Sequence, residues 1–199
     1  MTFEQIYADN GWSGDESLSG PGSGLVPTRP VADALVQLVR SLGVHSVLNA
    51  ACGDDMWMPD LPGYLGIDIV PLAISRARHN HPNRAYAVGD ARSITLPAFD
   101  LVLVRDVFQH LSYEDGQQLL GNIAASGSRW LLASTFMGGP NRDIVTGEAY
   151  RADLEAAPFG LPPAGQRIFD GYDYKKPNEE RDPDKWLALF DLDAVRGAR

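Results

Sequence analysis

Cysteine, basic residues and long apolar runs are scarce in this sequence. Cys52 is the only cysteine, which excludes an internal disulfide and a cysteine-based zinc cluster. No apolar run approaches the ~20 residues that a membrane-spanning helix needs. The N-terminus, MTFEQIYADNGW, has neither the basic nor the apolar region of a secretory signal. We therefore expect a cytoplasmic protein that does not enter a membrane.

Charge limits the partners that the chain can bind. Asp and Glu number 26 and Lys and Arg number 17, which gives a formal net charge of -9. A negative balance repels a phosphate backbone and an anionic lipid surface, so we expect neither nucleic acid nor a membrane as a partner. The hydrophobic share of 44% suits one compact core. We expect a single site for a small-molecule substrate.

The N-terminal part of the chain differs in composition from the rest. Residues 1–29 are rich in Gly, Ser, Asp and Asn, which predicts an N-terminal flap with little regular structure. Pro30 suits the first turn of a helix, and apolar residues follow it at helical spacing until Gly43. We therefore predict one domain over residues 30–199, preceded by the flap.

Beyond this helix, short apolar runs alternate with helical patterns. The runs expected to form buried parallel strands are 45–50, 64–70, 85–90, 99–106 and 129–136. Helices are expected over 71–80 and 112–126, so the alternation predicts a doubly wound, Rossmann-like α/β fold with a mostly parallel sheet. Residues 167–174 and 185–192 are expected to add an antiparallel pair at the C-terminal edge. The Pro- and Gly-containing residues 137–166 predict a functional loop.

The ends of the predicted parallel strands carry residues with chemistry. A ligand of such a sheet lies outside the carboxyl ends of its strands, where Asp68 is a suitable acceptor for two ribose hydroxyls. The preceding turn, LNAACGDDMW at residues 48–57, has one glycine where a pyrophosphate site needs three, and its Asp54 and Asp55 would repel phosphates. An adenosine without phosphates and with a cationic tail fits these features. S-adenosylmethionine is such a compound.

Four runs carry a family resemblance: VLNAACGDD, YLGIDIV, VGDA and FDLVLVRDVFQHL. In these runs the chain from about Pro30 to Leu192 resembles class I S-adenosylmethionine-dependent methyltransferases. The resemblance implies cofactor contacts at the matching positions. They are Asn49, Ala51, Cys52 and Gly53 for the methionine part, Asp68 and Ile69 for the ribose, Asp90 and Ala91 for the adenine, and Arg105 near the sulfonium. An acid and two glycines of the usual first motif are replaced here, by Asn49, Ala51 and Asp55.

A narrower resemblance rests on further runs, most of them in predicted loops: GSGLVPTRP, CGDDMWM, DIV, RDVFQHL, NRDIVTGE and PFGLPP. In these the chain is similar to small mycobacterial sugar O-methyltransferases of the methylmannose-polysaccharide type. The likeness implies that the methyl acceptor is a hydroxyl of a mannoside or oligosaccharide. It also implies a role in polysaccharide biosynthesis.

A sugar hydroxyl needs a base, or a metal ion that lowers its pKa, before it can attack a methyl group. Asp106 and His110 follow the fourth predicted strand at a spacing of one helical turn, and Asp143 follows the fifth. These three are the predicted catalytic residues. Asp106 and Asp143 could also share Mg²⁺, which prefers oxygen ligands. Alternatively, Asp106 pairs with Arg105 or a loop arginine, and His110 packs behind the strand or caps the next helix.

The acceptor is expected to enter between the flap and the loop 137–166. The residues predicted to contact it are Tyr7, Trp12 and Arg29 from the N-terminal part and Asn141, Arg142 and Glu148 from the loop. Aromatic rings in a Gly- and Ser-rich segment can stack on a sugar face, and the polar loop residues would give directional hydrogen bonds. A chain this short could also form a homodimer that completes the acceptor pocket.

Two other functions remain open from the sequence. A nicotinamide-dependent reductase shares the fold, and Tyr172 and Lys176 match its Tyr-x-x-x-Lys pattern, but they fall on a predicted strand and turn instead of one helix face. A non-catalytic S-adenosylmethionine-binding module is the other alternative. Such a module would not require the polar run NRDIVTGE.

Overall fold

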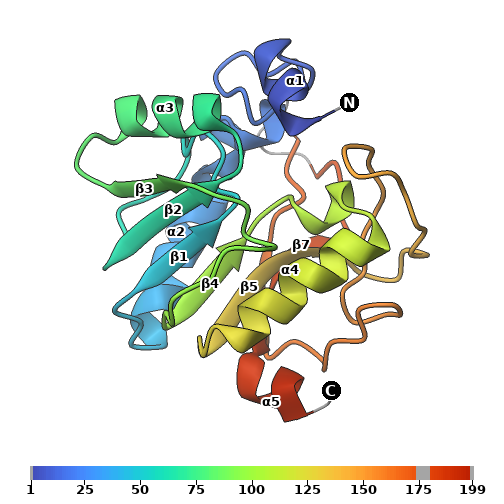
Figure 1. The fold of residues 1–199 in the computed structure, drawn as a ribbon. Coiled ribbons are helices and arrows are strands. Elements are labelled where there is room, and N and C mark those ends of the chain that lie inside the picture. The colour runs from blue at the N-terminus through green and yellow to red at the C-terminus, as the bar shows by residue number, and fades with distance from the viewer. Residues whose placement is uncertain (1, 174–179, 198–199) are drawn as a thin grey trace.

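The computed structural model describes residues 2–173 and 180–197. Its core is a seven-stranded sheet in the order β3-β2-β1-β4-β5-β7-β6 (Figure 1). The strands are β1 (Val47–Ala50), β2 (Tyr64–Asp68), β3 (Ala85–Val88), β4 (Leu101–Val104), β5 (Trp130–Phe136), β6 (Gln166–Phe169) and β7 (Lys185–Asp191). The α-helices are α1 (Phe3–Ala8), α2 (Leu25–Ser41), α3 (Pro71–Asn80), α4 (Tyr113–Ala125) and α5 (Leu192–Gly197), and Pro21–Ser23 and Phe108–His110 form short 3-10 helices.

The sheet has the predicted doubly wound architecture. Strands β3, β2, β1, β4 and β5 run parallel, and β7 lies antiparallel between β5 and β6. The predicted antiparallel C-terminal pair is therefore confirmed. The strand order reverses between β1 and β4, which is the point at which α/β sheets of this kind leave a crevice outside their carboxyl ends.

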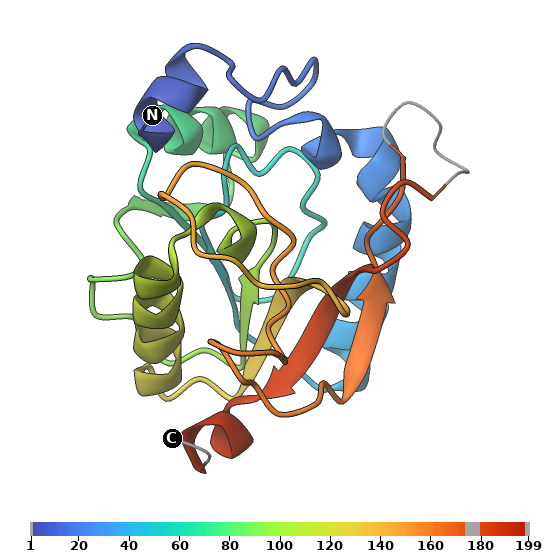
Figure 2. The same ribbon diagram turned by 90° about the vertical axis from the view of Figure 1, so that its right-hand side faces the viewer.

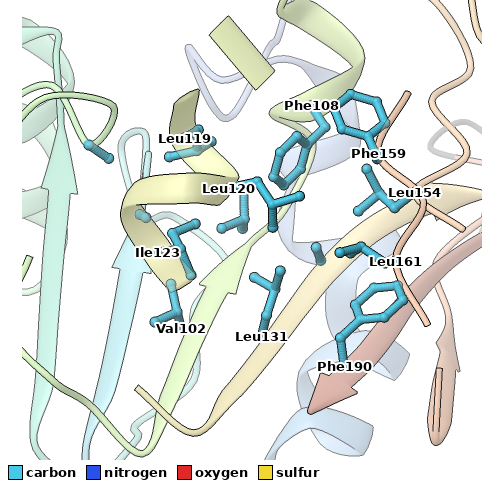
Figure 3. Packing of buried hydrophobic residues seen from close by; sticks show 14 of the residues in the cluster. Val102, Phe108, Leu119, Leu120, Ile123, Leu131, Leu154, Phe159, Leu161 and Phe190 are labelled. Atoms are coloured by element: carbon cyan, nitrogen blue, oxygen red, sulfur yellow. The ribbon is translucent and has the colours of Figure 1, made fainter. Parts of the chain in front are cut away.

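Apolar residues on both faces hold the sheet between its helices. All residues of β1 and of β4 are buried, as expected for central parallel strands covered on both sides. On one face, Leu120 and Ile123 of α4 pack with Val102 of β4 (Figure 3). On the other face, Leu35 of α2 and Ile74 of α3 belong to a second cluster. Each such side chain stabilises the fold by about 1.5–3 kcal/mol on burial.

Helix α2 begins earlier than the sequence predicts. It starts at Leu25, and Pro30 lies inside the helix instead of in its first turn. Gly24 is the N-cap residue, and the Thr28 hydroxyl donates to the Gly24 carbonyl at 2.6 Å. Because proline has no N–H, Pro30 leaves the Val26 carbonyl without its helical donor. Val26 is 53% exposed, so water can satisfy that carbonyl.

The residues before α2 are more ordered than predicted. Helix α1 has a capping box, in which the Thr2 hydroxyl accepts from the Gln5 N–H and the Gln5 side chain accepts from the Thr2 N–H. Tyr7 is buried against Val70 and Ala73, at the start of α3. Figure 2 shows this N-terminal segment in blue, crossing one end of the molecule. The predicted flap is thus a packed part of the fold.

Residues 137–165 contain no helix or strand, as predicted for this loop. Figure 1 shows the loop on the α4 side of the molecule, where Leu154, Phe159 and Leu161 join the apolar cluster of that face. Within residues 2–173 and 180–197, no helix has the length and apolar character needed to cross a membrane.

Candidate functional site

A cavity of about 450 Å³ lies at the carboxyl ends of β1, β2 and β4. This volume is in the range of ~300–1,000 Å³ that is typical of small-molecule sites. Its walls come from the turn after β1, the end of β2 and the residues that follow β4. The N-terminal segment and the residues that flank β6 and β7 complete it. The cavity therefore occupies the crevice expected from the reversal of strand order.

The turn after β1 has left-handed backbone at three alternating positions. The φ angle is +63° at Ala51, +60° at Gly53 and +55° at Asp55. A side chain at Gly53 would collide with the hydroxyls of Ser19 and Tyr7, so only glycine fits there. At Ala51 the same conformation costs about 1–2 kcal/mol relative to glycine. The residues of this turn that line the cavity are Asn49, Ala51, Cys52 and Gly53.

Asp68 ends β2 and lines the cavity. Its Oδ2 accepts a hydrogen bond from the Gly53 N–H at 2.8 Å, and its Oδ1 accepts from the Val70 N–H at 2.9 Å. Burial raises the pKa of this carboxyl to about 6 although both bonds oppose the shift, and the nearby Asp54 charge adds to it. When ionised, the carboxylate keeps lone pairs for the hydroxyls of a ribose. Ile69 lines the cavity beside it.

Asp54 does not line the cavity, contrary to the sequence argument that its charge faces the ligand. Its carboxylate accepts hydrogen bonds from the Ser17 hydroxyl at 2.7 Å, the Leu18 N–H at 2.8 Å and the Ser19 hydroxyl at 3.2 Å. These bonds fix the N-terminal segment to the turn after β1. Asp54 therefore helps to enclose the cavity from outside it.

Asp55 is also directed away from the cavity, into the core of the domain. Its carboxylate accepts from the hydroxyls of Tyr64 and Tyr86, both at 2.5 Å, and pairs with Arg84 at 3.1 Å. Burial raises the pKa of the Asp55 carboxyl, against the effect of these partners. The prediction that the two carboxylates meet the ligand was wrong. Only the missing glycines of this turn then disfavour a pyrophosphate.

Two aromatic residues of the N-terminal segment face the cavity, where the sequence predicted acceptor contacts. Tyr7 and Trp12 both line it, and their rings meet edge to face with centroids 5.4 Å apart. The Tyr7 hydroxyl is 2.8 Å from the Ser19 hydroxyl. The Trp12 ring also lies 5.6 Å from the His110 ring, which joins the N-terminal segment to the residues after β4.

His110 lies in the 3-10 helix after β4 and lines the cavity. Its Nδ1 is 2.8 Å from the Glu148 carbonyl oxygen, and because a carbonyl can only accept, we assign the ring proton to Nδ1. Burial lowers the pKa of the imidazole, the Asp106 charge opposes this shift, and the Lys185 charge adds to it. The ring is therefore neutral at neutral pH. Its Nε2 then carries a lone pair, and the Gln109 amide nitrogen lies 3.5 Å from it.

Four charged side chains form a buried cluster at the base of the cavity. Arg105 donates to Asp170 through Nε at 3.0 Å and Nη2 at 2.8 Å. Lys185 lies 2.8 Å from Asp106 Oδ1 and 3.2 Å from Asp170 Oδ2. The two cations hold the pKa of the Asp106 carboxyl well below its usual range. All four residues line the cavity, and the φ of Asp106 is +58°.

Arg105 connects the charged cluster to the N-terminal segment. Its Nη2 donates to the Gly22 carbonyl at 3.0 Å, and its guanidinium lies 4.8 Å from the centroid of the Trp57 ring. The neighbouring carboxylates raise the pKa of Arg105, so its charge is permanent. The sequence predicted that Arg105 lies near the sulfonium of the cofactor. The structure places Arg105 at the cavity, where its guanidinium N–H groups donate to Asp170 and Gly22.

Several predicted cofactor and catalytic residues lie outside the cavity. Asp90 forms a bidentate pair with Arg92, which lowers the pKa of the Asp90 carboxyl, and neither Asp90 nor the buried Ala91 lines the cavity. Asp143 accepts from the Tyr113 N–H at 2.8 Å and so caps the first turn of α4. The positions of Asp90 and Ala91 do not support a contact with the adenine, and the position of Asp143 does not support a contact with the methyl acceptor.

The predicted acceptor contacts from the loop also lie elsewhere. Asn141 donates to the carbonyls of Asp153 and Ala157, and Arg142 donates to the Ala149 carbonyl. Glu148 has an exposed side chain and contributes only its carbonyl, to His110. Arg29 is exposed on α2. None of these four predicted residues lines the cavity. Asn141 and Arg142 form hydrogen bonds within the loop, and the Glu148 carbonyl contacts His110.

The predicted magnesium site is not assembled. Asp106 lines the cavity beside Lys185, whereas Asp143 caps α4 outside it. Among the residues that the structure describes, no group of three or more His, Cys, Asp or Glu side chains could hold a metal ion. The position next to Asp106 that the sequence assigned to a cation holds the Lys185 ammonium instead.

The cavity residues that sequence reasoning missed include Trp57, Gln109, Asp170 and Lys185. Gln109 has a buried Oε1 without a hydrogen-bond partner in the described part of the chain. Lys185 carried a signal, because it is a cation at the first position of a strand that is otherwise largely apolar, KWLALFD. Asp170 follows β6 at the strand end, where acids are common at sites, but nothing local marked it as buried.

Residues 48–126 match the family model of a methyltransferase domain. This part of the chain is similar to methyltransferase domains. It includes the turn after β1, Asp68 and His110, and it supports S-adenosylmethionine-dependent methyl transfer. No curated protein sequence matches the chain significantly.

Solved structures of methyltransferases share the fold of the domain. The magnesium protoporphyrin IX methyltransferase from Synechocystis PCC 6803, with bound S-adenosylmethionine, is 15% identical with a TM-score of 0.62, over 95% of this chain and 93% of that chain. A TehB-like S-adenosylmethionine-dependent methyltransferase from Corynebacterium glutamicum is 19% identical with a TM-score of 0.50, over 81% of this chain and 97% of that chain. At these identities the likeness shows the fold.

The comparisons give no support to Mg²⁺. The reductase alternative has no support from position either. Tyr172 forms an isolated antiparallel bridge with Glu180 and does not lie on a helix. Lys176, the other half of the Tyr-x-x-x-Lys pattern, lies outside the described residues.

Proposed function

We propose that the protein is an S-adenosylmethionine-dependent O-methyltransferase that acts on a hydroxyl of a small polar acceptor. One observation carries the proposal: the Asp68 carboxylate and the His110 imidazole line the same cavity of the methyltransferase domain. The first group suits a ribose, and the second can take a proton from a hydroxyl. A module that only binds the cofactor would need the first group alone.

The chain's own groups fit the cofactor at one side of the cavity. Asp68 would accept hydrogen bonds from the ribose hydroxyls, and the turn Asn49–Gly53 would lie along the methionine part. Gly53 leaves the space that a Cβ would fill, between Ser19 and Tyr7. Tyr7 and Trp57 add aromatic surface to the lining. We call this part of the cavity, formed by residues 49–70 and Tyr7, the cofactor side.

The residues that follow β4 would carry the proton transfer. When bound, S-adenosylmethionine supplies an electrophilic methyl group for an in-line displacement. Nε2 of neutral His110 would accept the proton of the acceptor hydroxyl. The Nδ1–H of the same ring donates to the Glu148 carbonyl, which holds the ring in one orientation. Asp106 is a poor base because its neighbouring cations hold its pKa low. The position of Asp143 outside the cavity also supports His110 as the base. Most of the remaining catalysis would come from alignment.

A sugar is the acceptor class that we put first, as the resemblance of the sequence implies. Trp12 presents a ring to the cavity next to His110, and aromatic rings stack on the apolar face of a sugar. The Gln109 side chain also lines the cavity, next to His110. The predicted homodimer and cytoplasmic location stay predictions, as does the role in polysaccharide biosynthesis.

Calorimetry with S-adenosylhomocysteine tests the cofactor. The wild type should bind this compound and not NADPH, and Asp68→Ala should abolish the binding. Asp33→Ala, at an exposed acid on α2, is the matched control and should bind like the wild type. Binding of NADPH in place of S-adenosylhomocysteine would support the reductase and overturn the proposal.

Turnover tests the acceptor. The panel contains methyl α-mannoside, its O-methylated derivatives, methyl α-glucoside, a catechol and a carboxylic acid, and formation of S-adenosylhomocysteine is the readout. Turnover of a mannoside supports the sugar. Turnover of the catechol alone would indicate an aromatic hydroxyl as the acceptor instead of a sugar hydroxyl. Methylation of the carboxylic acid alone, or no turnover by a protein that binds the cofactor, would contradict hydroxyl methylation.

A further inference from the structure

We propose that Lys185 is a catalytic residue of this cavity, whose ammonium group stabilises the acceptor oxygen as that oxygen loses its proton. The inference rests on the proposed function and deepens it by assigning a built-in cation to the place where the sequence predicted Mg²⁺. We call the part of the cavity lined by Asp106, Gln109, His110, Asp170 and Lys185 the acceptor side.

The position of Lys185 is fixed by the fold. It is the first residue of β7, the strand that lies antiparallel between β5 and β6, so its side chain starts at the end of the sheet where the parallel strands finish. The side chain is only 10% exposed. Its Nζ lies 2.8 Å and 2.9 Å from the two oxygens of Asp106 and 3.2 Å from Asp170 Oδ2. Two carboxylates therefore lie within 3.2 Å of this ammonium group.

The hydrogen-bond arithmetic leaves the ammonium a donor for the acceptor. Lysine has three N–H donors. One donates to Asp106 Oδ2, and a second can donate to Asp170 Oδ2, whereas the contact with Asp106 Oδ1 does not have hydrogen-bond geometry. Asp170 is already neutralised by the bidentate contact with Arg105. The third donor can therefore serve an oxygen in the cavity, which Lys185 lines together with His110. A lysine that served only the fold would not need to reach the cavity.

A cation at this position has a defined chemical effect. An acceptor hydroxyl is a weak nucleophile until it loses its proton, and a fixed positive charge beside its oxygen lowers the energy of the developing alkoxide. In the balanced step, the acceptor oxygen gives its proton to Nε2 of His110 and an electron pair to the methyl carbon. The carbon–sulfur bond breaks as the carbon–oxygen bond forms, and its electrons stay on sulfur. Asp106, held between Lys185 and Arg105, is then a positioning residue.

The same arrangement favours a neutral acceptor. The cluster carries two positive and two negative side chains, so it offers no net positive charge to a carboxylate or phosphate. Lys185 can donate to an acceptor oxygen, and the His110 imidazole on the same cavity can accept the proton of that oxygen. A neutral hydroxyl group matches this pair of contacts. The substrate class that fits is a neutral alcohol, of which a sugar is one kind.

Variants of Lys185 test the inference in the intact protein, with the panel acceptor of highest turnover. Lys185→Met keeps the length and removes the charge, and it should lower kcat about 10²-fold, the typical loss for one pre-organised donor. Lys185→Arg should restore part of the rate. S-adenosylhomocysteine affinity should not change. Arg76→Met, an exposed cation on α3, is the control for loss of positive charge.

The pH profile separates catalysis from a structural effect. His110 faces Asp106, Lys185, Gln109, the Trp12 ring and the Glu148 carbonyl, and of these the Lys185 charge lowers the pKa of the imidazole. The rising limb of kcat with pH should therefore move to higher pH in Lys185→Met and stay in place in Arg76→Met. If the single variant does not fold, Lys185→Met with Asp106→Asn removes both charges and should show the same loss of rate.

Several outcomes would overturn the inference. If Lys185→Met has the kcat and pH profile of the wild type, the catalytic role of Lys185 is overturned. The methyltransferase proposal is not affected by that result. Activity that disappears with EDTA and returns with Mg²⁺ would show that a metal ion does this work. A protein that binds S-adenosylhomocysteine but methylates no hydroxyl would overturn the hydroxyl chemistry and this inference together. Failure to bind S-adenosylhomocysteine would overturn the proposed function itself.

Discussion

The cofactor side and the acceptor side of the cavity are built in different ways. On the cofactor side, the turn after β1 and Asp68 lie within residues 49–70 and are joined by a backbone hydrogen bond from Gly53 to Asp68. On the acceptor side, His110, Asp170 and Lys185 come from three separate parts of the chain and are held by side-chain contacts and ion pairs. One side depends on backbone conformation, and the other depends on charge and packing.

This difference has a functional meaning. A backbone turn accepts few substitutions, because its left-handed positions and close approaches exclude most side chains. Side chains brought together by loops can change while the scaffold persists, so acceptor chemistry varies among proteins of one fold. We therefore expect the two sides to respond separately to mutation, and four experiments test whether they do.

The largest effect is expected on the acceptor side, at His110. His110→Asn removes the base and should lower kcat by about 10²–10⁴-fold, because general-base catalysis contributes that much. The affinity for S-adenosylhomocysteine, measured by calorimetry, should stay unchanged. His79→Asn, at an exposed histidine of α3, is the control. Loss of cofactor affinity in His110→Asn would contradict the separation of the two sides.

The next effect is expected on the cofactor side, at Gly53. Gly53→Ala places a Cβ against Ser19 and Tyr7 at a φ of +60°. It should cost about 1–2 kcal/mol of stability, measured by thermal unfolding, and weaken S-adenosylhomocysteine binding about tenfold or more. Gly165→Ala, where an added Cβ meets nothing within 4 Å, is the matched control. Equal behaviour of the two variants would argue against a constrained turn.

Cofactor affinity should also depend on pH through Asp68. Burial raises the pKa of this carboxyl to about 6, and the ionised form is the one that accepts two ribose hydroxyls. Affinity for S-adenosylhomocysteine should therefore be full above pH 6 and fall below it, by up to about tenfold per pH unit. Asp68→Asn should bind weakly with no such dependence. A wild-type affinity that stays constant from neutral pH to pH 5 would exclude this role for Asp68.

The smallest effect is expected at Asp143, which the sequence placed in the acceptor site. Asp143→Ala removes the acceptor of the Tyr113 N–H and should lower stability by about 1 kcal/mol, as loss of a helix cap does. Turnover should not change, with or without Mg²⁺. Asp143→Asn keeps an oxygen acceptor and should be close to the wild type in stability. A large loss of kcat in both variants would return Asp143 to the acceptor side.

The sequence predicted the main elements of the sheet because each parallel strand is an apolar run between helical patterns. Helix α3 matches its prediction, and β2 differs from its prediction only at the end. The missed elements were short. Helix α1 carried a readable signal in its capping box, Thr2 with Gln5, but six residues give little periodicity to detect. The early start of α2 was hidden because Pro30 was assumed to mark the first turn.

The site was predictable to the extent that its residues are neighbours in the chain. The turn after β1 and Asp68 could be placed at strand ends from local pattern alone, and the structure brings them to one cavity. The directions in which the Asp54 and Asp55 side chains point could not be predicted from the sequence, because adjacent acids in a turn have several possible partners. Only the fold decides that Asp54 meets Ser17 and that Asp55 meets Tyr64 and Tyr86.

By itself, the sequence determined the doubly wound sheet, the strand ends that carry Gly53 and Asp68, and the exclusion of a glycine-rich pyrophosphate loop. These features follow from the periodicity of hydrophobic residues and from the residues that form turns, and both are visible within a few residues of sequence. The tertiary structure alone decided that Lys185 and Asp170 meet Asp106 and Arg105 at the acceptor side. A charged side chain finds its partner through space, and the chain separations involved, such as 79 residues between Asp106 and Lys185, leave no local pattern.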